Sequence, residues 1–95
     1  MTRLPLVEVD LSHAANSDEV HTLLSNALDF PGWYGCNWDA FWDAITGLVP
    51  MPLKLKILGW DGFSRRLPND ARLLKACLDD MHAQYPDEAS NVEFG

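Results

Sequence analysis

FPGWYGCNWDAFWDAITGL, residues 30–48, restricts the fold and function of this chain more than any other segment. Asn37 is a favourable N-cap, and the residues after it predict a short helix that extends to about Thr46 and is stopped by Gly47 and Pro50. The segment concentrates three tryptophans, one tyrosine and two aspartates in this helix and the turn before it. Large aromatic side chains belong in cores or binding sites, whereas aspartates belong in water unless a positive group meets them.

The predicted helix carries a row of acidic residues beside a row of aromatic ones. At about 100° per residue, one stripe holds Asp39, Asp43 and Thr46, and the next holds Trp38, Trp42 and Ile45. Like charges at positions i and i+4 repel by about a few tenths of a kcal/mol, and a cationic partner would remove that cost. The pattern therefore predicts a surface that a positively charged partner covers. We expect Trp38 or Phe41 to be partly buried, and at least two of Trp33, Tyr34, Trp38 and Trp42 to be exposed.

The two aspartates have alternative explanations, namely a solvated helix face, a catalytic pair or a metal site. A hard cation binds about six oxygen ligands, and the helix neighbours of the pair supply none. His13, His21 and His82 are scattered along the chain, so we expect no metal and no cofactor. Cys36 has no identifiable base beside it, and we expect no catalytic residue.

The charge distribution favours a basic protein over nucleic acid as the partner. The formal net charge is -7, and no lysine or arginine occurs between Arg3 and Lys54. Direct nucleic-acid binding needs a basic footprint, whereas complementary fields accelerate encounter with a cationic protein. The alternative is that the acidity only keeps the chain in solution.

The length and apolar content of the chain predict one domain, residues 1–95. The chain has 95 residues, of which 47% are hydrophobic, and such a length supports a core. No apolar run approaches the roughly 18 residues of a membrane span, and residues 1–10 turn acidic too early for a secretory signal. Cys36 and Cys77 lack the spacing of a disulfide framework. We therefore expect free thiols, a cytoplasmic location and no contact with a membrane.

The rest of the chain predicts strands separated by helices. Three segments have the pattern of strands, namely residues 7–11, 53–58 and 91–94. A first helix has two candidate N-caps, Asn16 and Ser17, carries an apolar stripe from Val20 to Leu28 and is ended by Pro31-Gly32. Further helices are expected at residues 37–46 and 68–84, with a turn and about one helical turn at residues 60–66. Strands joined by helical segments imply crossover connections. The expected fold is therefore α/β, a three-stranded parallel sheet packed with three to four helices.

Between residues 33 and 53 the sequence resembles the barstar family of ribonuclease inhibitors. The matching positions are Trp33, Tyr34, Gly35, Asn37, Asp39, Ala40, Trp42, Asp43, Thr46, Gly47, Val49, Pro52 and Leu53. The resemblance implies a barstar-like fold in which the second helix plugs the active site of a nuclease. It also implies an immunity protein, monomeric alone, that forms a 1:1 complex with a basic ribonuclease or other cationic toxin domain.

The resemblance assigns partner contacts position by position. Asp43 matches the aspartate that occupies the substrate phosphate site, and Asp39 matches a second contacting aspartate. Asp79, or Asp80 after a shift of one residue, matches an acidic contact from the last helix. The other partner-binding positions are Trp33, Asn37, Trp38, Trp42, Thr46 and Gly47.

The sequence departs from the barstar pattern at three positions near the acidic row. Trp38 is larger than the usual aliphatic residue, and Cys36 and Leu48 also depart from the family pattern, so these positions bear on which toxin fits. The resemblance also implies a cis peptide bond between Met51 and Pro52. Two further functions stay open, a barstar-like binding module for a partner that is not a nuclease and a cation-dependent acidic hydrolase.

Overall fold

Three parallel strands form one sheet in the order β1-β2-β3 in the computed structural model, which describes residues 3–95. β1 spans Leu6–Asp10, β2 spans Lys54–Leu58 and β3 spans Asn91–Phe94. In the register of these strands, Glu8 lies opposite Lys56, which in turn lies opposite Glu93. The three segments that the sequence predicts as strands are therefore all strands, and β2 is the central one.

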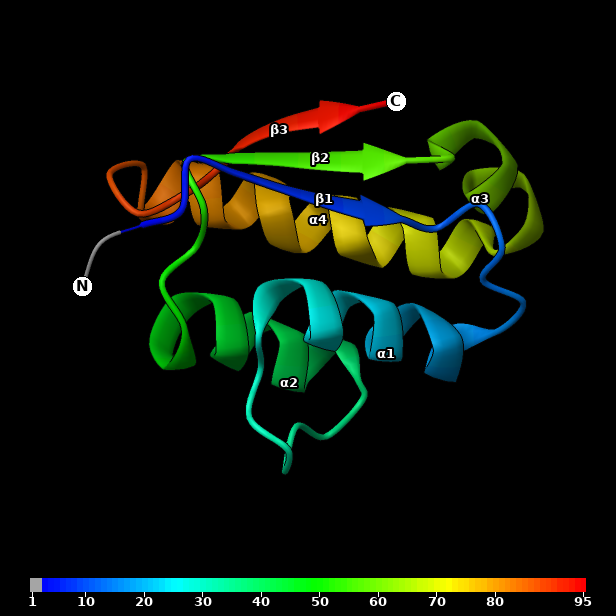
Figure 1. Ribbon diagram of the computed structural model, residues 1–95, viewed down its shortest axis with the longest axis horizontal. Coiled ribbons are helices and arrows are strands. Elements are labelled where there is room, and N and C mark those ends of the chain that lie inside the picture. The colour runs from blue at the N-terminus through cyan, green and yellow to red at the C-terminus, as the bar shows by residue number, and fades with distance from the viewer. Residues whose placement is uncertain (1–2) are drawn as a thin grey trace.

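The helices lie on one side of this sheet (Figure 1). They are α1, Ser17–Leu28; α2, Trp38–Asp43; α3, Trp60–Arg66; α4, Pro68–Gln84; and a π-helical turn, η1, Ala44–Leu48, that continues α2. One parallel sheet with four α-helices confirms the predicted α/β fold class. On the uncovered face, Glu8, Lys56 and Glu93 remain at least partly exposed, as alternation along a strand requires.

The core lies between the sheet and the helices. Alternate strand residues such as Val9, Leu55 and Ile57 are buried there, and Leu24 of α1 and Leu74 of α4 meet them from the helical layer. These positions follow the period of two for strands and the i, i+3, i+4 spacing for helices that the sequence displays. Burial of one face thus orients each element and decides which residues remain outside.

Of the two candidate N-caps of the first helix, Asn16 is the one that caps it. The side chain of Asn16 accepts a hydrogen bond from the backbone amide of Glu19 at 2.9 Å. The carboxylate of Glu19 accepts from the amide of Ala15 at 2.7 Å, one residue before the amide that a capping box would use. α1 therefore begins where the sequence predicts, with two of its end groups satisfied by local side chains.

The second helix does not end at Gly47 as predicted. It continues as η1, and the amide of Val49 closes the π turn by donating to the carbonyl oxygen of Ala44 at 3.1 Å. Val49 is extended, and the amide of Leu53 already pairs with the carbonyl oxygen of Leu4 at 2.8 Å. The helical segment therefore ends at Leu48, two residues later than predicted.

The Met51–Pro52 peptide bond is trans, so the prediction of a cis bond was wrong. A trans bond is the ordinary state before proline, and here the chain is extended at Val49 and joins the segment before β1 through the Leu53–Leu4 bond.

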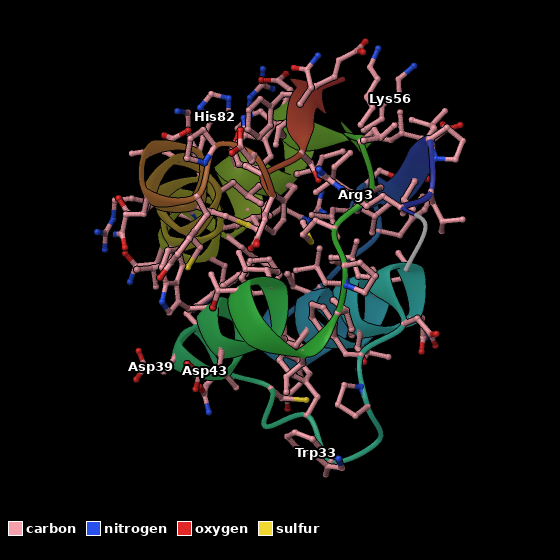
Figure 2. The ribbon with its side chains drawn as sticks, turned by 90° about the vertical axis from the view of Figure 1, so that its left-hand side faces the viewer. Arg3, Trp33, Asp39, Asp43, Lys56 and His82 are labelled. Atoms are coloured by element: carbon pink, nitrogen blue, oxygen red, sulfur yellow. The ribbon has the colours of Figure 1, made fainter. Side chains whose placement is uncertain are left out.

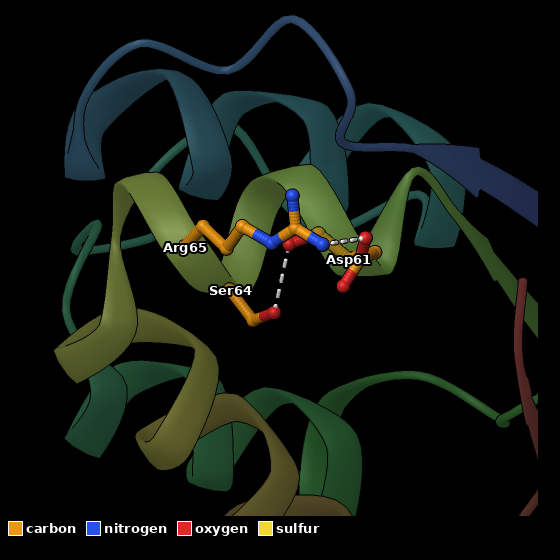
Figure 3. A network of polar contacts seen from close by, with 3 residues as sticks. All are labelled: Asp61, Ser64 and Arg65. Atoms are coloured by element: carbon orange, nitrogen blue, oxygen red, sulfur yellow. Dashed lines mark hydrogen bonds and ion pairs between the residues drawn. The ribbon is translucent and has the colours of Figure 1, made fainter.

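α3 is longer than the single turn that the sequence predicts. It follows Gly59, whose φ is 72° and where a Cβ would lie 2.4 Å from the Cβ of Ser12, so only glycine fits. On its outer side the guanidinium of Arg65 donates to the carboxylate of Asp61 at 2.6 Å, and the hydroxyl of Ser64 donates to the carbonyl oxygen of Asp61 at 3.0 Å (Figure 3). The charge of Asp61 is therefore balanced locally.

Candidate functional site

The start of α2 is fixed by Asn37, as predicted. Its side-chain oxygen accepts from the amide of Ala40 at 2.7 Å, and its carbonyl oxygen accepts from the amide of Phe41 at 2.9 Å. Phe41 is completely buried and anchors the helix to the core. Figure 2 shows Asp39 and Asp43 on the outer side of the helix, far from Lys56 on the uncovered face of the sheet.

A groove of about 610 Å³ runs between α2 and α4. Its α2 side consists of Trp38, Asp39, Trp42 and Asp43, and its α4 side consists of Leu73, Ala76, Cys77, Asp80 and Gln84. Three carboxylates therefore line one groove, two from α2 and one from α4. The acidic row and the aromatic row of the sequence lie together there.

The structure separates the two acids of α4 that the sequence leaves as alternatives. Asp79 forms an ion pair with Lys75 at 2.8 Å and does not line the groove, whereas Asp80 does. Consecutive helical residues point about 100° apart, so only one of the two can face α2. Asp80 is the residue that joins the α2 aspartates.

The three groove carboxylates have no ion-pair or hydrogen-bond partner among residues 3–95. In residues 3–95, ion pairs join Lys54 to Glu93, Arg65 to Asp61 and Lys75 to Asp79. None of those described pairs or side-chain hydrogen bonds involves Asp39, Asp43 or Asp80. Their negative charges are available to a ligand.

The thiol of Cys77 on the α4 side of the groove responds to this negative field. Burial raises its pKa, and the charges of Asp80 and Asp39 raise it further. A negative field disfavours the thiolate for the same reason that it favours a bound cation. Both Cys77 and the exposed Cys36 are free thiols, as predicted.

The aromatic residues are more buried than predicted. Trp33 is 73% exposed, but Tyr34, Trp38 and Trp42 are only partly exposed, so the prediction of at least two exposed members was wrong. The prediction that Trp38 would be partly buried is confirmed. Trp33 occupies the loop at the end of the molecule opposite Lys56 (Figure 2).

Trp38 is held by residues from two other helices. Its indole Nε1 donates to the carboxylate of Asp70 in α4 at 2.9 Å, and Asp70 also accepts from the hydroxyl of Ser17 at 3.1 Å. The ring packs on His21 of α1, with centroids 4.4 Å apart. Since its only polar group points inward, Trp38 offers the groove an apolar edge.

No helix within residues 3–95 is long and apolar enough to cross a membrane. The same residues contain no group of three or more His, Cys, Asp or Glu side chains that could hold a metal ion.

Comparison with known proteins agrees with this geometry. The family described as Barstar (barnase inhibitor) matches residues 4–95. The chain belongs to the barstar family. It is also similar to a protein of Bacillus subtilis (strain 168) named "Putative ribonuclease inhibitor YrdF", with 44% identity over 73 residues, which are 77% of this chain and 80% of that protein.

The π turn that follows α2 contains two further positions expected from the barstar pattern. The hydroxyl of Thr46 donates to the carbonyl oxygen of Trp42 at 2.6 Å, so its proton is used within the helix and is not available to a partner. Gly47 is exposed, and a Cβ there would meet nothing within 4 Å. Both residues line a second hollow of about 410 Å³, with Leu48 and Arg3 among its other walls.

Sequence reasoning named Asp80 of α4 but missed the other α4 residues that line the groove. Leu73, Ala76, Cys77, Asp80 and Gln84 follow the spacing i, i+3, i+4, i+7, i+11 of one helical stripe. That periodicity was present in the sequence. Apart from Asp80, however, nothing in the sequence showed that this stripe lines a groove, because only folding brings α2 beside it. Tyr85 was also missed; its ring lies 6.4 Å from that of Trp42, between centroids, and extends the aromatic surface.

Proposed function

We propose that this barstar-family chain is a ribonuclease inhibitor that occludes the active site of a basic ribonuclease with α2, the loop before it and the facing side of α4. The observation that supports the proposal is the groove of three carboxylates, Asp39, Asp43 and Asp80, which have no cationic partner among the described residues. A ribonuclease binds the phosphates of RNA through cationic groups, so closely spaced carboxylates can replace those phosphates.

The aromatic residues give this electrostatic contact its apolar surroundings. Trp33 is exposed in the loop before α2, and Trp38 and Trp42 line the groove together with the carboxylates. Tryptophan and tyrosine anchor many protein interfaces, where surrounding contacts exclude water from the central polar pairs. Ion pairs formed in such a place are stronger than those on an open surface.

The proposed inhibitor acts by binding and not by catalysis. It is a monomer that forms a 1:1 complex, and as an immunity protein it protects the cytoplasm of the cell that makes the toxin. Asp43, the last residue of α2, occupies the phosphate site, while Asp39 and Asp80 bind cationic side chains around it. Trp33, Asn37, Thr46 and Gly47 complete the contact surface.

The test is inhibition of RNA cleavage by a panel of basic microbial ribonucleases that includes barnase, with the chain titrated against each enzyme. Inhibition of one enzyme at 1:1 stoichiometry supports the proposal, and inhibition of none overturns it. Melting curves with and without Mg²⁺ or Mn²⁺ test the hydrolase alternative, because a bound cation would raise the melting temperature.

Variants then locate the surface. Asp43→Ala is expected to weaken binding by about 2–5 kcal/mol, a general range for truncating a close charge pair to which the barnase–barstar complex itself contributes, and Asp39→Ala by less. Asp61→Ala is the matched control, since it removes the same charge from an acid that is paired to Arg65 in α3. Equal losses for all three variants would contradict the groove assignment, and so would loss of folding stability in step with loss of binding.

A further inference from the structure

His21 is a buried histidine of α1 that lies behind the groove. It is 1% exposed, and its ring packs against that of Trp38. Its Nδ1 lies 2.7 Å from the hydroxyl oxygen of Tyr34 in the loop before α2. Within residues 3–95, its Nε2 is buried without a hydrogen-bond partner.

The contacts of the Tyr34 hydroxyl select one form of the His21 ring. That hydroxyl has a single proton, which it donates to the carbonyl oxygen of Asn37 at 3.4 Å. Because the buried Nε2 faces no acceptor, we assign the ring proton to Nδ1, so that the 2.7 Å contact is a bond in which Nδ1–H donates to the tyrosine oxygen. Nε2 then carries a lone pair and no hydrogen, so no buried N–H is left without an acceptor.

We propose that neutral His21 is a positioning residue for the loop before α2 and the start of α2, the segment that binds the partner in the proposed function. Through Tyr34, His21 holds the carbonyl of Asn37, and with it the first residues of α2, against α1. The consequence for inhibition rests on the function proposed above. Protonation of His21 places a second N–H, on Nε2, where no acceptor faces it. The charged ring then leaves its buried site for water, which breaks its bond to Tyr34 and loosens residues 33–41, so that the inhibitor weakens as the pH falls.

The groups around His21 come from three elements. Asp70 of α4 and Asp18 of α1 attract the protonated ring, but burial outweighs them and lowers the pKa of His21 from its ordinary value. On the loop, burial raises the pKa of the Tyr34 hydroxyl, with the Cys36 and Cys77 thiols nearby adding to the rise. Tyr34 therefore stays protonated while His21 titrates.

Amide hydrogen exchange of the free chain tests this inference without any ribonuclease. The chain carries His13→Gln and His82→Gln, two exposed positions, so that His21 is its one histidine, and its ring is titrated by NMR. Protection of the Ala40 and Phe41 amides, which are bound to Asn37, is measured at each pH after correction for intrinsic exchange. We expect this protection to fall about fivefold or more as His21 gains its proton, a factor equivalent to a net hydrogen bond of about 1 kcal/mol, while the amides of β2 keep theirs.

Two variants separate positioning from a general effect on stability. Tyr34→Phe removes only the hydroxyl, and should show the lower protection of Ala40 and Phe41 at neutral pH with no further loss on acidification. His21→Asn keeps a donor near the position of Nδ1 but does not titrate, and should restore protection that is independent of pH.

Protection of Ala40 and Phe41 that stays constant through the titration of His21 would overturn the proposal. So would an equal fall in β2, because His21 would then stabilise the whole fold and not the segment. Loss of ribonuclease inhibition in the earlier panel leaves this experiment unaffected, so the two proposals fail separately.

Discussion

Gly47 and Gly59 show how differently two glycines can be required. Gly59 has a φ of 72°, and a Cβ there would lie 2.4 Å from Ser12, so the fold itself demands glycine. Gly47 lies in η1, and a Cβ there would meet nothing within 4 Å. Since the chain alone gains nothing from glycine at position 47, the missing side chain is best explained by close approach of a partner.

Gly47→Ala should therefore stabilise the free chain and weaken the complex. Glycine within a helix costs about 0.5–1 kcal/mol relative to alanine, so urea unfolding should show a gain of that size, while inhibition of the ribonuclease should decrease. Gly59→Ala is the opposite control, with a large loss of stability. If Gly47→Ala binds as well as the wild type, this position faces solvent in the complex.

At the scale of elements, α2 contributes Asp39 and Asp43 to the groove, and the orientation of α4 makes Asp80 the third carboxylate. Asp79 and Asp80 are neighbours on one helix, yet the first is paired to Lys75 and the second lines the groove. Because consecutive helical residues point in different directions, Asp79 lies on the solvated face of α4 and Asp80 on the face that lines the groove. They form a natural pair for mutation.

Asp80→Asn should weaken inhibition by about 1.5–3 kcal/mol, the range for a hydrogen bond to a charged group, whereas Asp79→Asn should have little effect. Each substitution raises the net charge by the same amount, so the long-range field changes equally in both. Isothermal titration against an inhibited ribonuclease measures the difference. The reverse order of the two variants would mean that the other face of α4 meets the partner.

The packing of α1 against the loop before α2 should make the free energy of unfolding depend on pH. Burial lowers the pKa of His21 in the folded chain below 6.5, so the unfolded chain binds this proton at a higher pH than the folded chain does. The contribution is complete above about pH 6.5 and decreases as the pH falls toward the lowered pKa. Urea unfolding at several pH values measures this slope.

His21→Asn should lack that slope. A slope of the same size in the variant would assign it to other groups.

For the whole molecule, the arrangement of charge matters more than the net value of -7. The ion pairs of the described residues lie on α3, on the outer side of α4 and on the uncovered face of the sheet. The groove keeps its carboxylates unpaired. Three unpaired carboxylates within one groove make a local negative field, which orients the molecule as it approaches a cationic protein.

Association with an inhibited ribonuclease should slow steeply as salt is added, while dissociation changes far less. Steering acts over about a Debye length, roughly 10 Å at 0.1 M and roughly 3 Å at 1 M, whereas contacts inside the complex are poorly screened. Stopped-flow measurements across a salt series give both rates. An association rate that is indifferent to salt would remove steering and leave the aromatic surface as the source of affinity.

The sequence alone determined the elements of this chain and the acidic face of α2. Alternation in the strands, the stripes of α1 and α4 and the cap at Asn37 depend on neighbours within a few residues, so local physical chemistry suffices to predict them. Asp39 and Asp43 lie one helical turn apart on an exposed face for the same reason. The parallel order of the strands follows from their helical connections.

Only the tertiary structure decided which residues share the site. The choice of Asp80 over Asp79, the indole bond from Trp38 to Asp70 and the bond between His21 and Tyr34 all join segments that the chain brings together only by folding. The burial of the aromatics depends on the same contacts. Residue spacing along one segment contains no information about what a second segment places against it, and the groove exists only between two.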